Sequence, residues 1–227
     1  MGTSPFIGAG QFGTKSLMYY SKFYLNPRNI VRIISKSIEL GVRGIQVLPE
    51  KPVIWAIKEV LRRYEEKLII VPSIFNVKDI ELMQEFDCPL MLIHGALTDQ
   101  RNPSLINKLL NHIGDIGALG GLITHTPVAT MKWLINKEFE YEVLMIPLNK
   151  AGYMMDGSLA EIGSLISKLG KKIIAKKVLA AGRLPVFDAI EFISKLKFVD
   201  AIALGIASEE EAEETFSTAF KVFVKRS

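Results

Sequence analysis

The chain has 227 residues, a mass of 25.3 kDa and a mean hydropathy of +0.25, values that exclude a disordered chain and fit one large domain or two small ones. Its formal net charge at pH 7 is only +4, from 28 Lys and Arg residues against 24 Asp and Glu residues. The basic residues are spread along the sequence and form no block, so we expect no nucleic-acid partner.

Cysteine usage and the lengths of the apolar runs indicate the compartment. The one cysteine, Cys88, cannot form an internal disulfide, which is typical of a reducing environment. Apolar runs such as residues 68–71 and 90–93 are far shorter than the roughly 18 residues of a membrane-spanning helix, and residues 1–5 lack the features of a secretory signal. We therefore expect a cytoplasmic protein without a membrane partner. Scarce Gln beside plentiful Lys, Ile and Glu resembles the composition of thermophilic proteins.

Short apolar runs alternate with longer stretches of helical periodicity, which is the pattern of βα units around a parallel sheet. The first helix is predicted to begin at Asn26-Pro27 and to end at Gly41, and the last helix is predicted to begin at Ser208. Eight strands are predicted, at Pro5–Ala9, Gly44–Leu48, Leu68–Val71, Leu90–His94, Gly120–Thr124, Glu142–Ile146, Lys172–Lys176 and Ala201–Leu204.

Eight such units average about 28 residues each, which suits an α/β fold with a single (β/α)8 TIM barrel over residues 1–227. No linker and no change of composition marks a second domain. An open, doubly wound sheet shows the same alternation and is the alternative fold, but such a sheet seldom needs eight evenly spaced strands.

A glycine-rich segment follows the first predicted strand. Residues 8–13 have the G-x-G-x-x-G spacing that lets a backbone approach a dinucleotide. A Rossmann loop also needs a helix that starts at the last glycine and an acidic residue at the end of the next strand, and the sequence offers neither. We interpret the segment as a flexible first barrel loop. The aromatic residues after it can fold over the barrel mouth, and they are Tyr19, Tyr20, Phe23 and Tyr24.

Histidines end two neighbouring predicted strands. His94 closes the fourth strand and His125 closes the fifth, which places both imidazoles at the carboxyl end of the barrel, where (β/α)8 enzymes carry their chemistry. Each histidine is either a site residue or a hydrogen-bonded structural residue. No H-x-H or H-E-x-x-H spacing accompanies them, so we expect no metal.

The carboxyl ends of the last two strands offer groups for an anion. The turn Gly205–Ser208 leads into the acidic start of a helix, where backbone N–H groups can hold a phosphate. Its serine and Glu211 also form an S-x-x-E capping box, so helix capping explains the same residues. Lys176, Lys177 and Arg183 can neutralise an anion or form a solvated charge cluster. Alternation along the strand predicts that one of the two lysines faces the barrel mouth.

Several segments, in order, resemble the aldo-keto reductase superfamily. The resemblance implies a (β/α)8 barrel that binds a nicotinamide cofactor, NAD or NADP, across its carboxyl mouth. Residues 8–13 are similar to the family's opening strand, residues 90–95 to its D-x-x-x-x-H strand, and residues 121–127 to its GxSxHxP segment. Each match is short, but together they touch most of the chain. The other matching segments are 38–42, 145–149, 174–184 and 205–208.

The reductases of this family use an Asp, a Tyr, a Lys and a His to donate a proton to a carbonyl while the cofactor delivers hydride. Only the histidine aligns, as His94, which the resemblance implies to be catalytic. Gln46 stands at the Asp position, Ser73 at the Lys position, and the shortened loop 48–52 carries no Tyr. No group of suitable acidity is then left for reduction at neutral pH, unless a tyrosine enters from the first loop.

The resemblance also implies ligand contacts. For the substrate, these are Gln46, Ser73 and His125. Gln46 lies within a predicted strand and the other implied residues follow predicted strands, so we expect a small-molecule site at the carboxyl ends of the barrel. The implied cofactor contacts are Asn149, Lys177, Gly182, Arg183, Gly205 and Ser208.

The sequence therefore predicts a divergent, aldo-keto-reductase-like barrel that binds a nicotinamide or another phosphate-bearing small molecule, without ordinary carbonyl reductase activity. A 2′-phosphate is disfavoured because the acidic residues within 209–214 crowd the expected phosphate end. Two alternatives stay open. One is a non-catalytic binding or assembly barrel that forms a homo-oligomer through an apolar surface, for which the high hydropathy argues. The other is a weak oxidoreductase with a non-standard proton donor.

Overall fold

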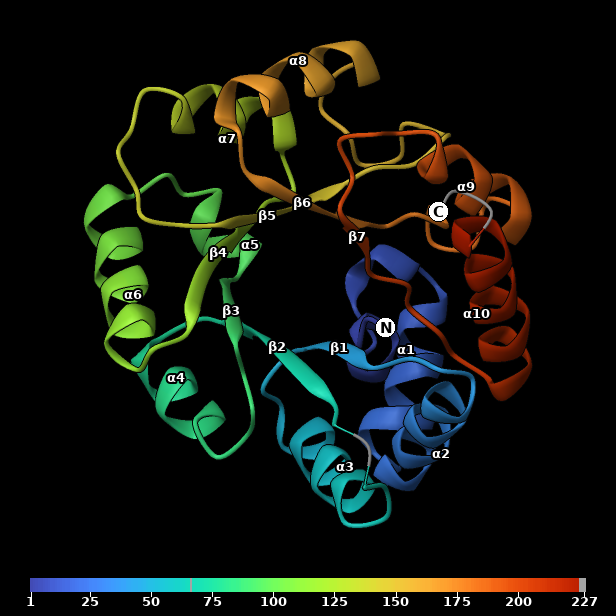
Figure 1. Ribbon diagram of the computed structural model, residues 1–227. Helices are drawn as coiled ribbons and strands as arrows, with labels where there is room; N and C mark the ends of the chain where they lie inside the picture. The colour runs from blue at the N-terminus through green and yellow to red at the C-terminus, as the bar shows by residue number, and fades with distance from the viewer. Residues whose placement is uncertain (66, 225–227) are drawn as a thin grey trace.

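A ring of seven parallel strands forms the centre of the computed structural model, which describes residues 1–65 and 67–224 (Figure 1). Each strand pairs in parallel with the next one along the chain, so the spatial order of the strands is also their sequence order. This is the order that consecutive βα units produce in a barrel. The strands are β1 (Gly44–Val47), β2 (Ile69–Ile74), β3 (Leu90–Ile93), β4 (Leu119–Ile123), β5 (Val143–Pro147), β6 (Lys172–Lys176) and β7 (Ala201–Ile202).

The longer helices lie outside the ring, and most of them connect one strand to the next (Figure 1). Short helical turns precede the first of them, namely η1 (Ser4–Ile7), η2 (Gly10–Phe12), α1 (Lys15–Tyr19) and the π-helix η3 (Tyr20–Tyr24). The remaining helices are α2 (Pro27–Glu39), α3 (Lys51–Leu61), α4 (Val77–Met83), α5 (Gly95–Thr98), α6 (Pro103–Asp115), α7 (Pro127–Leu134), α8 (Leu159–Leu169), α9 (Val186–Ser194) and α10 (Glu209–Val224).

Helix α2 illustrates how the sequence specifies the outer layer. Pro27 occupies the first turn, where its missing N–H costs nothing and its fixed φ favours the helix. Ile30, Ile34 and Ile38 recur at helical spacing and are all buried, so one face of α2 packs inward. The helix therefore lies where the sequence predicts it, between Asn26 and Gly41. Helix α10 likewise begins directly after Ser208.

The predicted strand Pro5–Ala9 is wrong. Ser4–Ile7 forms a 3-10 helix that ends at Gly8 in the left-handed conformation, with φ +60°. Pro5 has no N–H to donate to a sheet, which disfavours a paired strand at this position. The eighth position of the ring is instead occupied by Gly2, which bridges Gln46 on one side and Gly205 on the other. The N–H of Gly2 donates a 2.8 Å hydrogen bond to Leu204 O.

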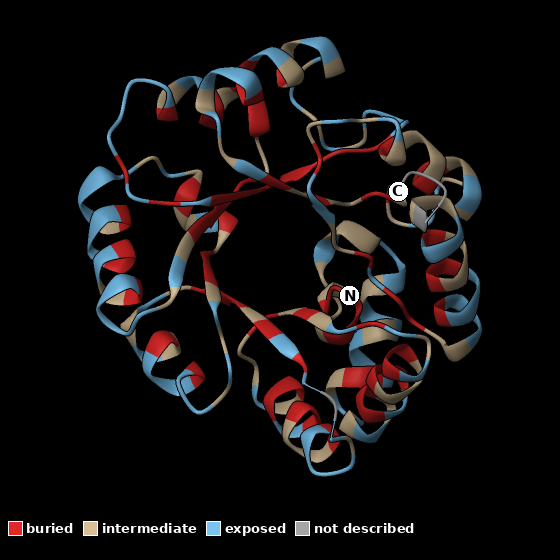
Figure 2. Ribbon diagram, in the orientation of Figure 1, coloured by how far each residue is buried: buried red, intermediate tan, exposed pale blue. Residues whose placement is uncertain are grey.

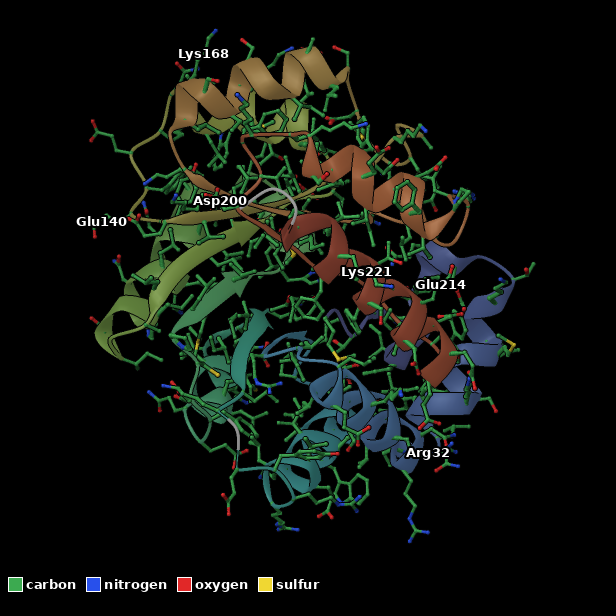
Figure 3. The ribbon with its side chains drawn as sticks, turned by 45° about the vertical axis from the view of Figure 1, so that its right-hand side comes forward. Arg32, Glu140, Lys168, Asp200, Glu214 and Lys221 are labelled. Carbon is green, nitrogen blue, oxygen red and sulfur yellow. The ribbon has the colours of Figure 1, made fainter. Side chains whose placement is uncertain are left out.

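Apolar side chains fill two layers, and these account for much of the high hydropathy. Inside the barrel, Leu92, Ile123, Val143 and Met145 form a buried cluster. Most of the other buried side chains belong to the layer between the strands and the helices, and Figure 2 shows the buried residues on the strands and on the helix faces turned towards them. Charged side chains such as Lys168 and Lys221 project from the outside (Figure 3). Within residues 1–65 and 67–224, no helix has the length and apolar character to cross a membrane.

Candidate functional site

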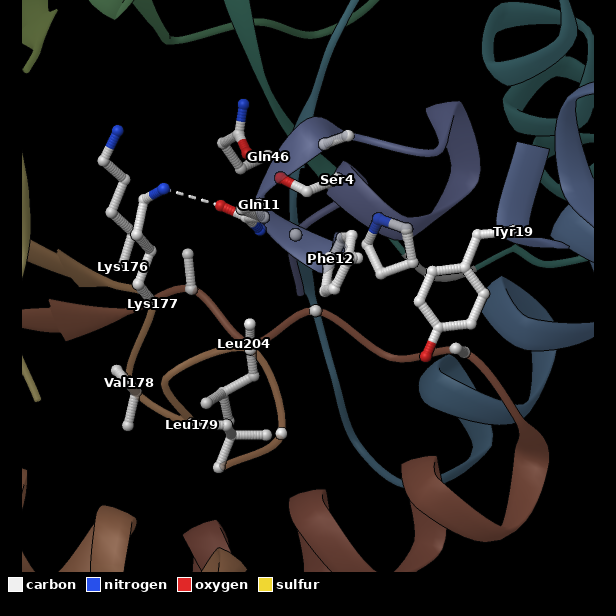
Figure 4. A pocket seen from close by; sticks show the side chains of 18 of the residues that line it. Ser4, Gln11, Phe12, Tyr19, Gln46, Lys176, Lys177, Val178, Leu179 and Leu204 are labelled. Carbon is white, nitrogen blue, oxygen red and sulfur yellow. Dashed lines mark hydrogen bonds between the residues drawn. The ribbon is translucent and has the colours of Figure 1, made fainter. Parts of the chain in front are cut away.

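A cavity of about 360 Å³ opens at the carboxyl ends of the strands. Its inner end lies over the barrel, and its outer end runs between the loop that follows β6 and the start of α10. Figure 4 shows Lys176 and Lys177 side by side at one end of the cavity and Tyr19 towards the other. The polar side chains at the inner end are Gln46, Ser73, His94, His125, Lys176 and Lys177.

The His94 imidazole is held in one orientation and one tautomer. Its Nδ1 accepts a 3.1 Å hydrogen bond from the Ala96 N–H, and its ring stacks on Phe75 at a centroid distance of 4.1 Å. Since Nδ1 accepts, the proton of the neutral ring sits on Nε2. Burial, with His125 and Lys176 nearby, lowers the pKa of His94 to about 4 despite the opposing charge of Asp99. His94 is therefore a neutral hydrogen-bond donor at pH 7.

Asp99, at the carboxyl end of α5, orients the second histidine. Its Oδ2 accepts hydrogen bonds from the His125 backbone N–H at 2.9 Å and from His125 Nδ1 at 3.1 Å. Thr124 and Thr130 donate to its Oδ1. Burial alone would raise the pKa of Asp99, but the hydrogen bonds from His125 and Thr124 outweigh burial and lower the pKa to about 2. Because Nδ1 donates its proton to the carboxylate, Nε2 of the neutral His125 ring is a hydrogen-bond acceptor.

Both lysines at the end of β6 line the cavity. Lys176 faces inward as the last strand residue, and Lys177 leaves the extended conformation with φ +57°. A left-handed residue breaks the in-and-out alternation of the strand, so the second side chain also reaches the cavity. The prediction that one of the two faces the mouth is therefore corrected to both. The strain of such a residue, on the order of 1 kcal/mol, is often found at functional sites.

The two amino groups differ in their partners. Lys177 Nζ donates a 2.7 Å hydrogen bond to Gln11 Oε1 (Figure 4) and lies 3.0 Å from Met154 Sδ. Lys176 makes no hydrogen bond or ion pair with any residue that the structure describes. Burial and the Lys177 charge lower the pKa of Lys176 to about 7, and burial lowers the pKa of Lys177 to about 8. Uncharged amine is therefore abundant at this end of the cavity near neutral pH.

Comparison with known proteins identifies the fold. No protein-family model matches the sequence, and no curated protein matches it. A candidate aldo-keto reductase from Pseudomonas aeruginosa superposes with a TM-score of 0.69 at 17% identity, over 98% of this chain and 89% of that one. An aldo-keto reductase from a Medee basin deep-sea metagenome library gives 0.63 at 10% identity, over 86% of each chain. The chain has the fold of the aldo-keto reductases.

A third similar structure is a mutant of the protein Gox0644 in complex with NADPH, with a TM-score of 0.63 at 12% identity, over 87% of this chain and 79% of that one. Identities this low establish a shared fold, and any activity has to be argued from the side chains of this chain.

Gln46 and Ser73, which the resemblance places at the Asp and Lys positions of the aldo-keto reductases, form a neutral pair. Gln46 Nε2 donates a 2.7 Å hydrogen bond to Ser73 Oγ. Tyr19 lines the cavity, but burial and the nearby Glu211 charge raise its pKa. Tyr20 does not line the cavity and stacks on Tyr24 at 4.6 Å. No described tyrosine therefore sits in the cavity with a lowered pKa.

The implied cofactor contacts divide into two groups. Lys177, Gly182 and Gly205 line the cavity. Asn149, Arg183 and Ser208 do not. The Asn149 amide is buried and bonded to the Tyr153 backbone at 2.7 and 2.9 Å, and Arg183 lies over the Tyr153 ring at 4.0 Å. The geometry does not favour cofactor contact by these residues.

The cavity lining includes two acidic side chains and, from α1, the cation Lys15. The acidic side chains are Glu211 and Glu214, and Glu211 Oε2 accepts a 2.8 Å hydrogen bond from the Ala207 N–H. The Glu211 N–H in turn donates to Ser208 Oγ at 3.1 Å. The Ala207 N–H and the Ser208 hydroxyl, which were candidate contacts for a phosphate, are thus hydrogen-bonded within the protein. Helix capping predicts such bonds.

Asp99 was not predicted as a site residue. Its signal in the sequence is an acidic residue shortly after a strand that ends in histidine, next to a second strand that also ends in histidine. Gln11 was not predicted either, although its side chain accepts a hydrogen bond from Lys177. Among the described residues, no group of three His, Cys, Asp or Glu side chains is placed to hold a metal.

Proposed function

We propose that the protein binds a nicotinamide dinucleotide, or another small molecule that carries a phosphate, at the carboxyl-end cavity, and that it does not catalyse ordinary carbonyl reduction. The observation that carries the proposal is the position of the Lys177 ammonium in the cavity. This cation faces the cavity and has no carboxylate partner among the described residues, so an anionic group of a ligand is its natural counterion.

The inner and outer ends of the cavity fit such a dinucleotide unequally. At the inner end, Lys177 offers a positive charge, and His94 Nε2–H offers a neutral donor to a polar ligand atom. At the outer end, Glu211 and Glu214 would repel a further phosphate. The arrangement therefore favours a dinucleotide without a 2′-phosphate over one that carries it.

A bound reduced nicotinamide would supply a hydride, and carbonyl reduction would also need a proton donor of suitable acidity. Gln46 and Ser73 hold each other in a neutral hydrogen bond and lower the pKa of no neighbouring acid. Tyr19 has a raised pKa, and His94 is neutral at pH 7. These groups can orient a carbonyl but are poor donors to it, which supports the absence of ordinary reductase activity.

The proposal is tested by titrating the purified protein with NADH and NADPH and by following turnover of simple aldehydes. We expect saturable binding, with NADH at least as tight as NADPH, and no turnover above background. Lys177→Met should weaken binding roughly tenfold through loss of a charged contact. The matched control Lys150→Met removes an exposed lysine outside the cavity and should change nothing.

Two results would contradict the proposal. Robust aldehyde turnover that disappears in His94→Ala would show a working reductase with a non-standard proton donor. Absence of binding for both dinucleotides would favour the assembly barrel instead. That alternative has one structural observation in its support, since Leu17, Met18 and Leu25 near the first helical turns are exposed.

A further inference from the structure

Lys176 has no role in the proposed function. Its half-buried side chain places the amino group in the cavity without a hydrogen-bond or ion-pair partner in the described part of the chain, although lysines withdrawn from water are normally paired. Apolar side chains such as Ile123 and Met145 line the same cavity, so packing alone does not explain an amine at this position. An unpaired amine at the carboxyl end of a barrel strand is a candidate nucleophile.

We propose that Lys176 forms an imine with a small carbonyl compound that carries an anionic group, and that His125, oriented by Asp99, moves the protons of this reaction. The inference goes beyond dinucleotide binding and depends only on the inner end of the cavity. We expect the compound to carry an anionic group because the Lys177 ammonium also lines the cavity and would attract it.

The groups around Lys176 come from five strands and from α5, and they suit this chemistry. The Lys177 charge opposes the charged ammonium of Lys176, while the Asp99 charge favours it. His125 lies beside His94, with ring centroids 5.7 Å apart. The nearest groups from β1 and β2, Gln46 and Ser73, are neutral. Burial and Lys177 together keep a large share of the amine unprotonated near pH 7.

Imine formation needs a base and then an acid, and the structure offers one group for both. The Lys176 nitrogen attacks the carbonyl carbon, forming a C–N bond while the C=O electrons move to oxygen. His125 Nε2 carries a first proton from the nitrogen to the alkoxide oxygen, which becomes a hydroxyl. It then carries a second proton from the nitrogen to this hydroxyl, which leaves as water when the C=N bond forms. The balance is amine plus carbonyl compound giving imine plus water, with no oxidant or reductant. His94 Nε2–H, a fixed neutral donor, can hydrogen-bond the carbonyl oxygen.

The test uses the full chain, three carbonyl probes and sodium cyanoborohydride to trap the imine. Pyruvate and dihydroxyacetone phosphate carry an anionic group, and acetone does not. After trapping, intact mass and peptide mapping should find one adduct, on Lys176, formed faster from the anionic probes. The labelling rate should rise through about pH 7, whereas exposed lysines label near a pKa of about 10.4.

Variants separate a catalytic site from incidental labelling. Lys176→Met should abolish the adduct, and Lys172→Met, at the opposite and exposed end of β6, should keep it. Asp99→Asn and His125→Gln should slow trapping about tenfold or more if the pair moves protons. Lys177→Met should reduce the anionic probes to the rate of acetone.

The inference is overturned if label spreads over exposed lysines equally in the wild type and in Lys176→Met, or if none of the three probes labels Lys176. Dinucleotide titration of Lys176→Met, which retains Lys177, keeps the two proposals apart. In the wild type, absence of trapping on Lys176 with dinucleotide binding present would refute the imine site alone, and trapping on Lys176 without dinucleotide binding would refute the dinucleotide proposal alone.

Discussion

Asp99 and His125 are joined twice, through the His125 backbone N–H at 2.9 Å and through the ring Nδ1 at 3.1 Å, both to the same carboxylate oxygen. The backbone bond fixes the loop that follows β4, and the ring bond fixes the direction in which Nε2 points. One carboxylate therefore sets both the position and the tautomer of a histidine at the cavity.

Replacing this carboxylate should change stability and its pH dependence. The folded-state pKa of Asp99 is about 2 against 3.8, so its contribution of about 2 kcal/mol is present above the unfolded value and is lost as pH falls through the folded one. Asp99→Asn should lower the free energy of unfolding at pH 7 and flatten its acid dependence between pH 3.8 and 2. Urea unfolding at several pH values measures both. The exposed Asp115→Asn is the control, and a wild-type acid dependence retained in Asp99→Asn would contradict the assignment.

Gly95 should be intolerant of a side chain because of His125. A Cβ at Gly95 would lie 2.4 Å from His125 Cε1 and 2.5 Å from Nδ1. Gly95→Ala should displace the ring and cost about 1–3 kcal/mol of stability, as overpacking does. Gly114→Ala is a matched control with the opposite sign, because nothing lies within 4 Å of a Cβ there and alanine favours a helix interior by about 0.5–1 kcal/mol. Thermal unfolding of both variants distinguishes them, and equal shifts would refute the contact.

Periodicity predicted the seven strands of the ring because each has an apolar run between polar turns. Lys172–Lys176 has its predicted bounds, and Leu90–Ile93 differs from its prediction by one residue. The first strand was not predictable in this way. Pro5 and Phe6 read as an apolar run, but they pack as a 3-10 helix with both side chains buried, and the strand position falls to Gly2.

The predicted strand ends placed His94 and His125 at the cavity, since parallel strands end at the same edge, and the family resemblance added Gln46 and Ser73, which also line it. Neither could give side-chain partners. The Asn149 amide, which also follows a strand, turns to the Tyr153 backbone. The left-handed backbone of Lys177 has no local signature, because the residue is neither glycine nor asparagine.

The Glu211 carboxylate should oppose ligand phosphates at the outer end of the cavity. It lines the cavity and takes the Ala207 N–H. Glu211→Gln removes the charge and keeps an acceptor, so we expect NADH to bind about threefold to tenfold more tightly, for a Coulombic relief of about 1 kcal/mol. NADPH should gain more than NADH. Glu213→Gln, paired with Lys36 outside the cavity, is the control, and unchanged affinities in Glu211→Gln would place the phosphate elsewhere.

Lys176 should destabilise the folded protein at neutral and lower pH, and this destabilisation should disappear at high pH. Its pKa is about 7 in the folded state against 10.5, so between these values the unfolded chain binds a proton that the folded chain does not, and the free energy of unfolding rises with pH. Lys176→Met should therefore be more stable than the wild type below pH 7, by on the order of 5 kcal/mol, because it buries no charge. Near pH 10.5 the wild type should approach the variant. Urea unfolding across this range provides the measurement, with Lys172→Met as the control on the same strand. A constant difference between the two curves would show that Lys176 does not titrate in this window.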